Sequence, residues 1–131
     1  MKQSKVLTTY LTVAGLLLSF IGGATLLMPV ELKAGSGIDI AGNIGVLNDV
    51  RASSALVLAL AVFTFLGGLR PRLRVSASLI APLMFLSLGT GRVISILADG
   101  MPVEGQIGAT VLEFLFGITG VILFNMYREK N

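Results

Sequence analysis

The stretch at 52–69, ASSALVLALAVFTFLGGL, contains no charged residue and decides the class of this protein. A transmembrane helix needs about 20 mainly apolar residues, with a range of roughly 17–25. The basic stretch RPRLR follows at 70–74, and a second long apolar run starts at Val75. Two such runs with so short a connection predict neighbouring, antiparallel helices that span a membrane.

The rest of the chain has the same apolar character. Of its 131 residues, 54% are apolar and only 13% are charged, whereas a soluble globular domain carries about 25% charged residues. This composition excludes a soluble enzyme, a disordered tail and a fibrous repeat. The length fits one domain, so we expect a single transmembrane domain over residues 1–131.

Four apolar runs are long enough to cross a bilayer. Because lipid offers backbone amides no hydrogen-bond partner, each run should be helical. We therefore expect an all-α fold, a transmembrane four-helix bundle, with spans at about 6–30, 44–69, 75–98 and 107–126. Asn43 is expected to cap the second helix. The long Gly-containing loop before it, 31–43, should lie across the outer face of the bundle.

Lysine and arginine predict the orientation of the bundle. With the N-terminus in the cytoplasm, the outer side holds only Lys33 and Arg51, and most acidic residues lie outside. We therefore expect both termini in the cytoplasm (N-in/C-in) of a bacterial inner membrane. The residues expected on the cytoplasmic side are Lys2, Lys5, Arg70, Arg72, Arg74, Arg128 and Lys130.

The arginines of the short connection, Arg70, Arg72 and Arg74, are interpreted as a lipid-facing basic anchor. Binding of anionic lipid at the cytoplasmic face is the functional alternative for them. The formal net charge of +3 and the pI near 9.7 could indicate a nucleic-acid partner. The basic residues form no single stripe, however, so we expect membrane lipids and no nucleic acid as partners.

The residue types needed for several kinds of chemistry are missing. The sequence has no Cys and no His, which removes thiolate nucleophiles, the usual haem ligand and most transition-metal sites. No Gly-rich nucleotide-binding motif is present. We therefore expect a non-enzymatic protein without a metal or cofactor.

Small residues recur on one face of the first span, at Thr8, Thr12, Gly15, Ser19 and Gly22. Small residues allow close helix contact in lipid. Packing within the bundle is the favoured interpretation of this face, and contact between copies of the chain is the alternative.

Two charged residues interrupt the last two spans. Arg92 lies six residues before Ala98, and Glu113 lies six residues after Ile107. At 1.5 Å per residue, each is about 9 Å inside the end of its own helix. A charge inside a span needs a partner, and antiparallel neighbours place these two at matching depth. We therefore predict an ion pair between Arg92 and Glu113.

Further polar residues should join this pair in the outer half of the bundle. A structural network is one interpretation, with Arg51 bound to Asp99 or Asp49. A polar pocket for a phosphate or carboxylate headgroup is another, and a proton relay through Glu113 is a third, which the nearby arginine opposes. The candidate cluster contains Asn48, Asp49, Arg51, Arg92, Ser95, Asp99 and Glu113.

The same residues carry a resemblance to a family. The sequence reads Asn-Asp-Val-Arg-Ala at 48–52, Gly-Arg-Val-Ile-Ser at 91–95 and Asp-Gly-Met-Pro at 99–102, with Glu113 in the last helix. From about residue 35 to 124 this is similar to domain-of-unknown-function family 4345, small bacterial proteins with four spans. That family usually has Glu at the position of Asp49. The resemblance implies the fold and a polar cluster at Asn48, Arg51, Arg92, Asp99 and Glu113, and no substrate.

These patterns support two main functions. The first is an accessory or scaffold subunit that packs against other membrane proteins in a larger complex, or against itself as a homo-oligomer. Its support is the small size, the small-residue faces and the missing catalytic groups. The alternative is a module that binds a lipid or amphiphile at an outer-leaflet site formed by Arg51, Arg92 and Glu113. An enzyme or transporter would have to rely on carboxylates, arginines and hydroxyls alone.

Overall fold

The computed structural model describes residues 2–129, and within this range the chain forms helices and no strand. This confirms the predicted all-α fold; Lys130, expected on the cytoplasmic side, lies outside the described residues. In chain order the elements are α1 (Lys5–Leu27), α2 (Pro29–Gly35), α3 (Ile44–Leu69), the 3₁₀ turn η1 (Pro71–Leu73), α4 (Arg74–Asp99) and α5 (Glu104–Tyr127).

Four helices are long and apolar enough to cross a membrane: α1, α3, α4 together with η1, and α5. Most of their large apolar side chains point outward, as expected where lipid rather than water surrounds the bundle. The four expected spans are therefore present, and they identify an integral membrane protein.

The helix ends follow local chemistry. Asn43 caps α3 as predicted, because its side-chain oxygen accepts a hydrogen bond from the Val46 amide at 3.1 Å. The first helix ends at Leu27, before the expected limit at residue 30, because Met28 is not helical and precedes Pro29, which disfavours the helical conformation there. Pro29 then opens α2, so part of the predicted loop at 31–43 is a short helix.

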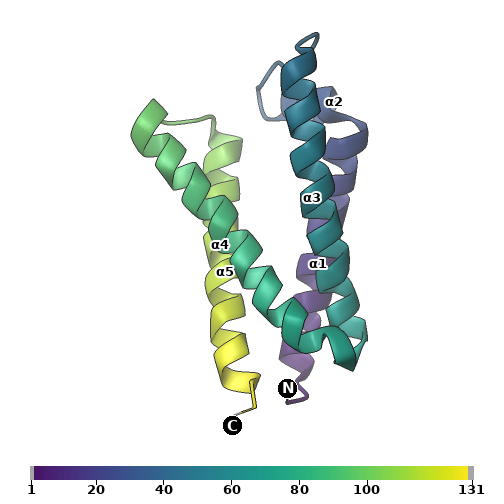
Figure 1. Ribbon diagram of the computed structural model, residues 1–131. Coiled ribbons are helices and arrows are strands. Elements are labelled where there is room, and N and C mark those ends of the chain that lie inside the picture. Colours follow the sequence, from purple (N-terminus) through teal and green to yellow (C-terminus); the bar gives the residue numbers. More distant parts are fainter. Residues whose placement is uncertain (1, 130–131) are drawn as a thin grey trace.

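The spanning helices are arranged as two pairs, α1 with α3 and α4 with α5, as Figure 1 shows. Both ends of the chain lie at one end of the bundle, where the Lys2 amide donates to the Tyr127 carbonyl at 2.8 Å. We call this the terminal end, which also holds η1. The opposite end, with α2 and the connection at 100–103, is the distal end.

Glycine allows the close approach of α1 and α3. A Cβ at Gly15 would lie 2.6 Å from the Cα of Phe65, and one at Gly22 would lie 3.1 Å from the Leu58 nitrogen. The small-residue face of α1 therefore packs within the protein, as the favoured interpretation expected.

The two helix pairs meet mainly in the terminal half. The Tyr10 hydroxyl on α1 donates to the Phe116 carbonyl on α5 at 2.7 Å, and the rings of these two residues lie with centroids 6.2 Å apart. Small residues on α4 let the helices approach here. The buried apolar residues around this contact are Leu7, Tyr10, Leu11, Ala77, Ala81 and Leu123.

The contact between α1 and α3 yields a prediction. Gly15→Ala should lower the free energy of unfolding by about 1–3 kcal/mol, because the added methyl group meets the α3 backbone. Gly108→Ala is the matched control: nothing lies within 4 Å of its added Cβ, and alanine is the better helix former. Thermal unfolding in neutral detergent compares the two. Equal midpoints would contradict the close contact.

Candidate functional site

The centre of the candidate site is the predicted ion pair between α4 and α5. The Arg92 Nε–H is shared between the two Glu113 carboxylate oxygens, at 3.0 Å from Oε1 and 2.9 Å from Oε2. The Glu113 side chain is 10% exposed and that of Arg92 is 35% exposed. The pair thus compensates the deeply placed carboxylate and leaves the arginine more accessible.

In this pair most hydrogen-bond donors of the Arg92 guanidinium remain free. A guanidinium carries five N–H donors, and here only Nε binds Glu113. Neither Nη1 nor Nη2 has a hydrogen-bond partner among residues 2–129. The free edge of a guanidinium matches the two oxygens of a carboxylate or phosphate. The arginine can therefore hold Glu113 and an anion together.

A cavity of about 280 Å³ lies beside this pair, between the two helix pairs in the distal half. Its walls are mostly apolar, and polar groups line part of them. Every helix contributes lining residues: Leu17, Leu18, Ile21, Gly22, Thr25, Lys33, Ser53, Ser54, Val57, Phe85, Leu88, Arg92, Ala109, Leu112, Glu113 and Phe116. We call it the distal cavity.

Lys33 on α2 is a lining residue that the candidate cluster did not include. It is half-buried and makes no ion pair within the described range 2–129. Lys33 and Arg92 against the single carboxylate of Glu113 give the distal cavity a formal charge of +1. The sequence places Lys33 on the expected outer side, but its position over the cavity depends on α2, which the span pattern does not predict.

Arg51 does not join the ion pair. It is exposed, and its Nη1 donates to the Leu26 carbonyl in the last turn of α1. The expected pairing with Asp49 or Asp99 is wrong for the described part of the chain, and Arg51 is not among the residues that line the distal cavity. The last carbonyls of a helix lack intrahelical donors, so a cation at this depth on α3 finds its partner there.

The other members of the predicted cluster do not bond to Arg92 or Glu113, although Ser95 and Arg92 line a common pocket of about 390 Å³. Ser95 donates to Asp99 at 3.2 Å on the exposed end of α4. Asn48 and Asp49 are exposed on the first turns of α3. The structure thus divides the candidate cluster among three places: the Arg92–Glu113 pair, the distal end of α4 and the distal end of α3.

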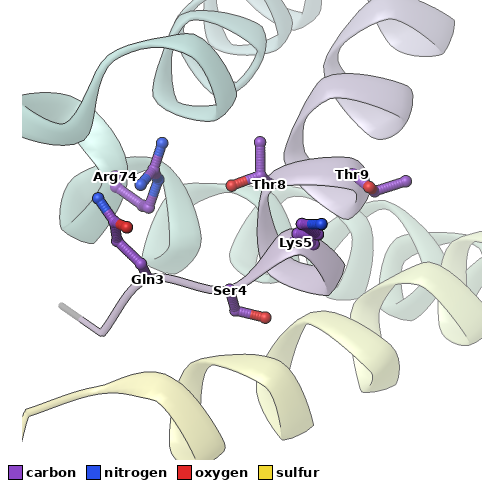
Figure 2. A pocket seen from close by; sticks show the side chains of 6 residues that line it. All are labelled: Gln3, Ser4, Lys5, Thr8, Thr9 and Arg74. Carbon is purple, nitrogen blue, oxygen red and sulfur yellow. The ribbon is translucent and has the colours of Figure 1, made fainter.

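The three arginines of the short connection also differ from one another. Arg70 and Arg72 are exposed, as a lipid-facing anchor requires. Arg74 is only 8% exposed, so its assignment to that anchor is wrong. Its Nε and Nη2 donate to the carbonyls of Gly67 and Gly68 at 3.4 and 3.2 Å. Because η1 turns the chain back, Arg74 caps the C-terminal end of α3, beside the start of α1 (Figure 2).

The polar lining of the distal cavity carries more positive than negative charge. Within residues 2–129, no three acidic side chains gather closely enough to hold a metal ion. The polar lining consists of two cations, one carboxylate already paired, and hydroxyls from Thr25, Ser53 and Ser54.

The family model described as "Domain of unknown function (DUF4345)" matches residues 6–124. This chain belongs to that family. The resemblance in the sequence began at about residue 35, whereas the family match starts at residue 6 and so includes nearly all of α1. No curated protein and no solved structure matches this DUF4345 chain.

The ion pair in this DUF4345 protein can be tested by a double-mutant cycle. Glu113→Gln and Arg92→Gln should each destabilise the bundle because each leaves a charge without its partner. The double variant should lose less than the sum, with a coupling of about 0.5–3 kcal/mol. The readout is the unfolding free energy in neutral detergent.

A matched cycle on Ser95→Ala and Asp99→Asn removes an exposed hydrogen bond on the same helix. Its single effects should stay within about 0.5 kcal/mol. Additive losses at Arg92 and Glu113 would mean that the pair contributes nothing to stability.

Proposed function

We propose that this protein is a non-enzymatic membrane protein that binds an anionic amphiphile in the distal cavity. The observation that carries the proposal is the free edge of Arg92: Nη1 and Nη2 are unpaired within residues 2–129, although Nε is held by Glu113. An unpaired guanidinium edge at membrane depth is costly. A ligand phosphate or carboxylate would compensate it through two parallel hydrogen bonds.

The shape of the distal cavity supports the same proposal. Lys33 and Arg92 provide positive charge for a headgroup, while Leu18, Val57 and Leu112 provide apolar walls for a chain. Its volume of about 280 Å³ is near the lower limit of ligand pockets, roughly 300 Å³. The cavity therefore suits a headgroup and part of one alkyl chain of the ligand, while the remainder of that alkyl chain lies in the bilayer.

This proposal replaces the site first expected at Arg51, Arg92 and Glu113. Lys33 takes the place of Arg51 as the second cation, because Lys33 lines the cavity and Arg51 instead binds a carbonyl of α1. The revised site consists of Lys33, Arg92 and Glu113.

An accessory or scaffold subunit is the weaker candidate. Its support included the small-residue faces, which could have served contacts with other proteins. Gly15 and Gly22 of α1 pack against α3. Gly117 and Gly120 of α5 pack against α4: a Cβ added at Gly117 would lie 2.6 Å from Leu86, and one at Gly120 would lie 2.9 Å from Pro82. These faces are thus occupied within one copy of the chain.

We further propose that the protein lies in a bacterial inner membrane with both termini in the cytoplasm. The support is the distribution of basic residues, which concentrate at the terminal end. In this orientation the distal cavity belongs to the outer half of the bilayer.

The binding proposal is tested with hexadecyl phosphate and uncharged hexadecanol as probes, by native mass spectrometry from neutral detergent. The wild type should retain hexadecyl phosphate in preference to hexadecanol. Lys33→Gln should lower this retention about fivefold, which corresponds to roughly 1 kcal/mol for one cation near the membrane surface. Arg51→Gln is the matched control, since it removes the same charge from the distal end without touching the cavity.

A second variant tests the apolar part of the site. Ala109→Phe should fill the distal cavity and abolish retention of hexadecyl phosphate while every charge stays in place. Equal retention in the wild type, Lys33→Gln and Ala109→Phe would refute the proposed site.

A further inference from the structure

The terminal end holds a second cavity, far from the distal one. It has a volume of about 600 Å³ and is lined by Gln3, Ser4, Lys5, Thr8, Thr9 and Arg74. These residues come from the first turns of α1, the segment before it, and the start of α4 (Figure 2). We call it the terminal cavity.

The lining of the terminal cavity is rich in hydrogen-bond donors and contains no acidic residue. Lys5 and Arg74 give it a formal charge of +2. The Thr8 and Thr9 hydroxyls and the Gln3 amide have no side-chain hydrogen bond within the described residues, so they are available to a ligand. In Figure 2 the Thr8 hydroxyl is turned toward Arg74 and Gln3.

The burial and the fixed position of Arg74 distinguish this cavity from a patch of charge on the surface. The residue is 8% exposed, and Nε and Nη2 are fixed by the carbonyls of Gly67 and Gly68. Nη1 has no partner in the described part of the chain. A guanidinium held in place with one nitrogen free loses little freedom when it binds an anion. The positive end of the α1 dipole lies on the same side and favours negative charge.

From this arrangement we propose that the terminal cavity binds a phosphate group, held by Lys5, Arg74 and the Thr8 hydroxyl. The inference is independent of the distal cavity, since the two share no lining residue. The phosphate can belong to a lipid headgroup at this face of the membrane or to a soluble phosphate compound. The two sources have the same chemistry at the site and are separated by experiment.

The test compares Lys5→Gln with Arg72→Gln. Both remove one positive charge from the terminal end, but Arg72 is exposed and does not line the cavity. Retention of phosphatidylglycerol over phosphatidylcholine is measured by native mass spectrometry from mixed nanodiscs. Lys5→Gln should lower the preference about fivefold, the effect of roughly one cation–headgroup interaction, and Arg72→Gln should change it less.

A second variant distinguishes a site that hydrogen-bonds the headgroup from diffuse electrostatic attraction. Thr8→Val keeps the charge and nearly the volume of the side chain, and removes only the hydroxyl. It should lower phosphatidylglycerol retention if the headgroup is hydrogen-bonded in the cavity. Arg74→Gln is avoided because Arg74 also caps α3 and its loss would disturb the fold.

The source of the phosphate is distinguished with inorganic phosphate as the probe in neutral maltoside micelles. Binding of inorganic phosphate that Lys5→Gln weakens and Arg72→Gln preserves supports a soluble phosphate ligand. The same pattern for phosphatidylglycerol alone supports a lipid headgroup. Equal losses in Lys5→Gln and Arg72→Gln, with no effect of Thr8→Val, would overturn the proposal and leave only diffuse electrostatic attraction.

Discussion

The arrangement of the whole molecule depends on the contact that joins its two helix pairs. The Tyr10 hydroxyl binds the Phe116 carbonyl, and Ala77, Ala81 and Gly120 are small enough to let the backbones approach. Inside a bilayer the apolar surface of a helix gains little from leaving lipid, so such close packing and hydrogen bonding must hold the pairs together. Because this contact lies in the terminal half, the helices leave room between them in the distal half. The distal cavity therefore follows from where the pairs are joined.

The features that depend on distance along one helix were predictable from the sequence. Four apolar runs predicted the spans, and equal depth on antiparallel neighbours predicted the pair of Arg92 with Glu113, because helix rise per residue is constant. The N-cap at Asn43 depended only on local chemistry. These predictions needed the local sequence and the order of the spans along the chain, but not how the two helix pairs pack against each other.

The features that depend on how helix ends meet were not predictable in this way. Arg51 and Arg74 were assigned by counting charges on each side of the membrane, yet each binds carbonyls at the C-terminal end of a neighbouring helix, α1 and α3 respectively. Charge counting treats arginine as a point charge, whereas the folded protein uses it as a donor for backbone groups that lack partners. Lys33 was placed on the outer side but not in the candidate cluster for a related reason, since only the short helix after Pro29 brings it to the distal cavity.

The free donors of the basic residues are a more informative guide to binding than their total charge. Arg51 and Arg74 are partly committed to backbone carbonyls, and Arg92 to Glu113. Two sets of donors that stay unpaired in the described residues lie on cavity walls: the free edge of Arg92 with Lys33 at one end, and one nitrogen of Arg74 with Lys5 at the other. Neither cavity has an unpaired acid on its wall. An excess of fixed donors over acceptors, repeated at both ends of an apolar bundle, is the arrangement expected of a protein whose ligands bring the negative charge.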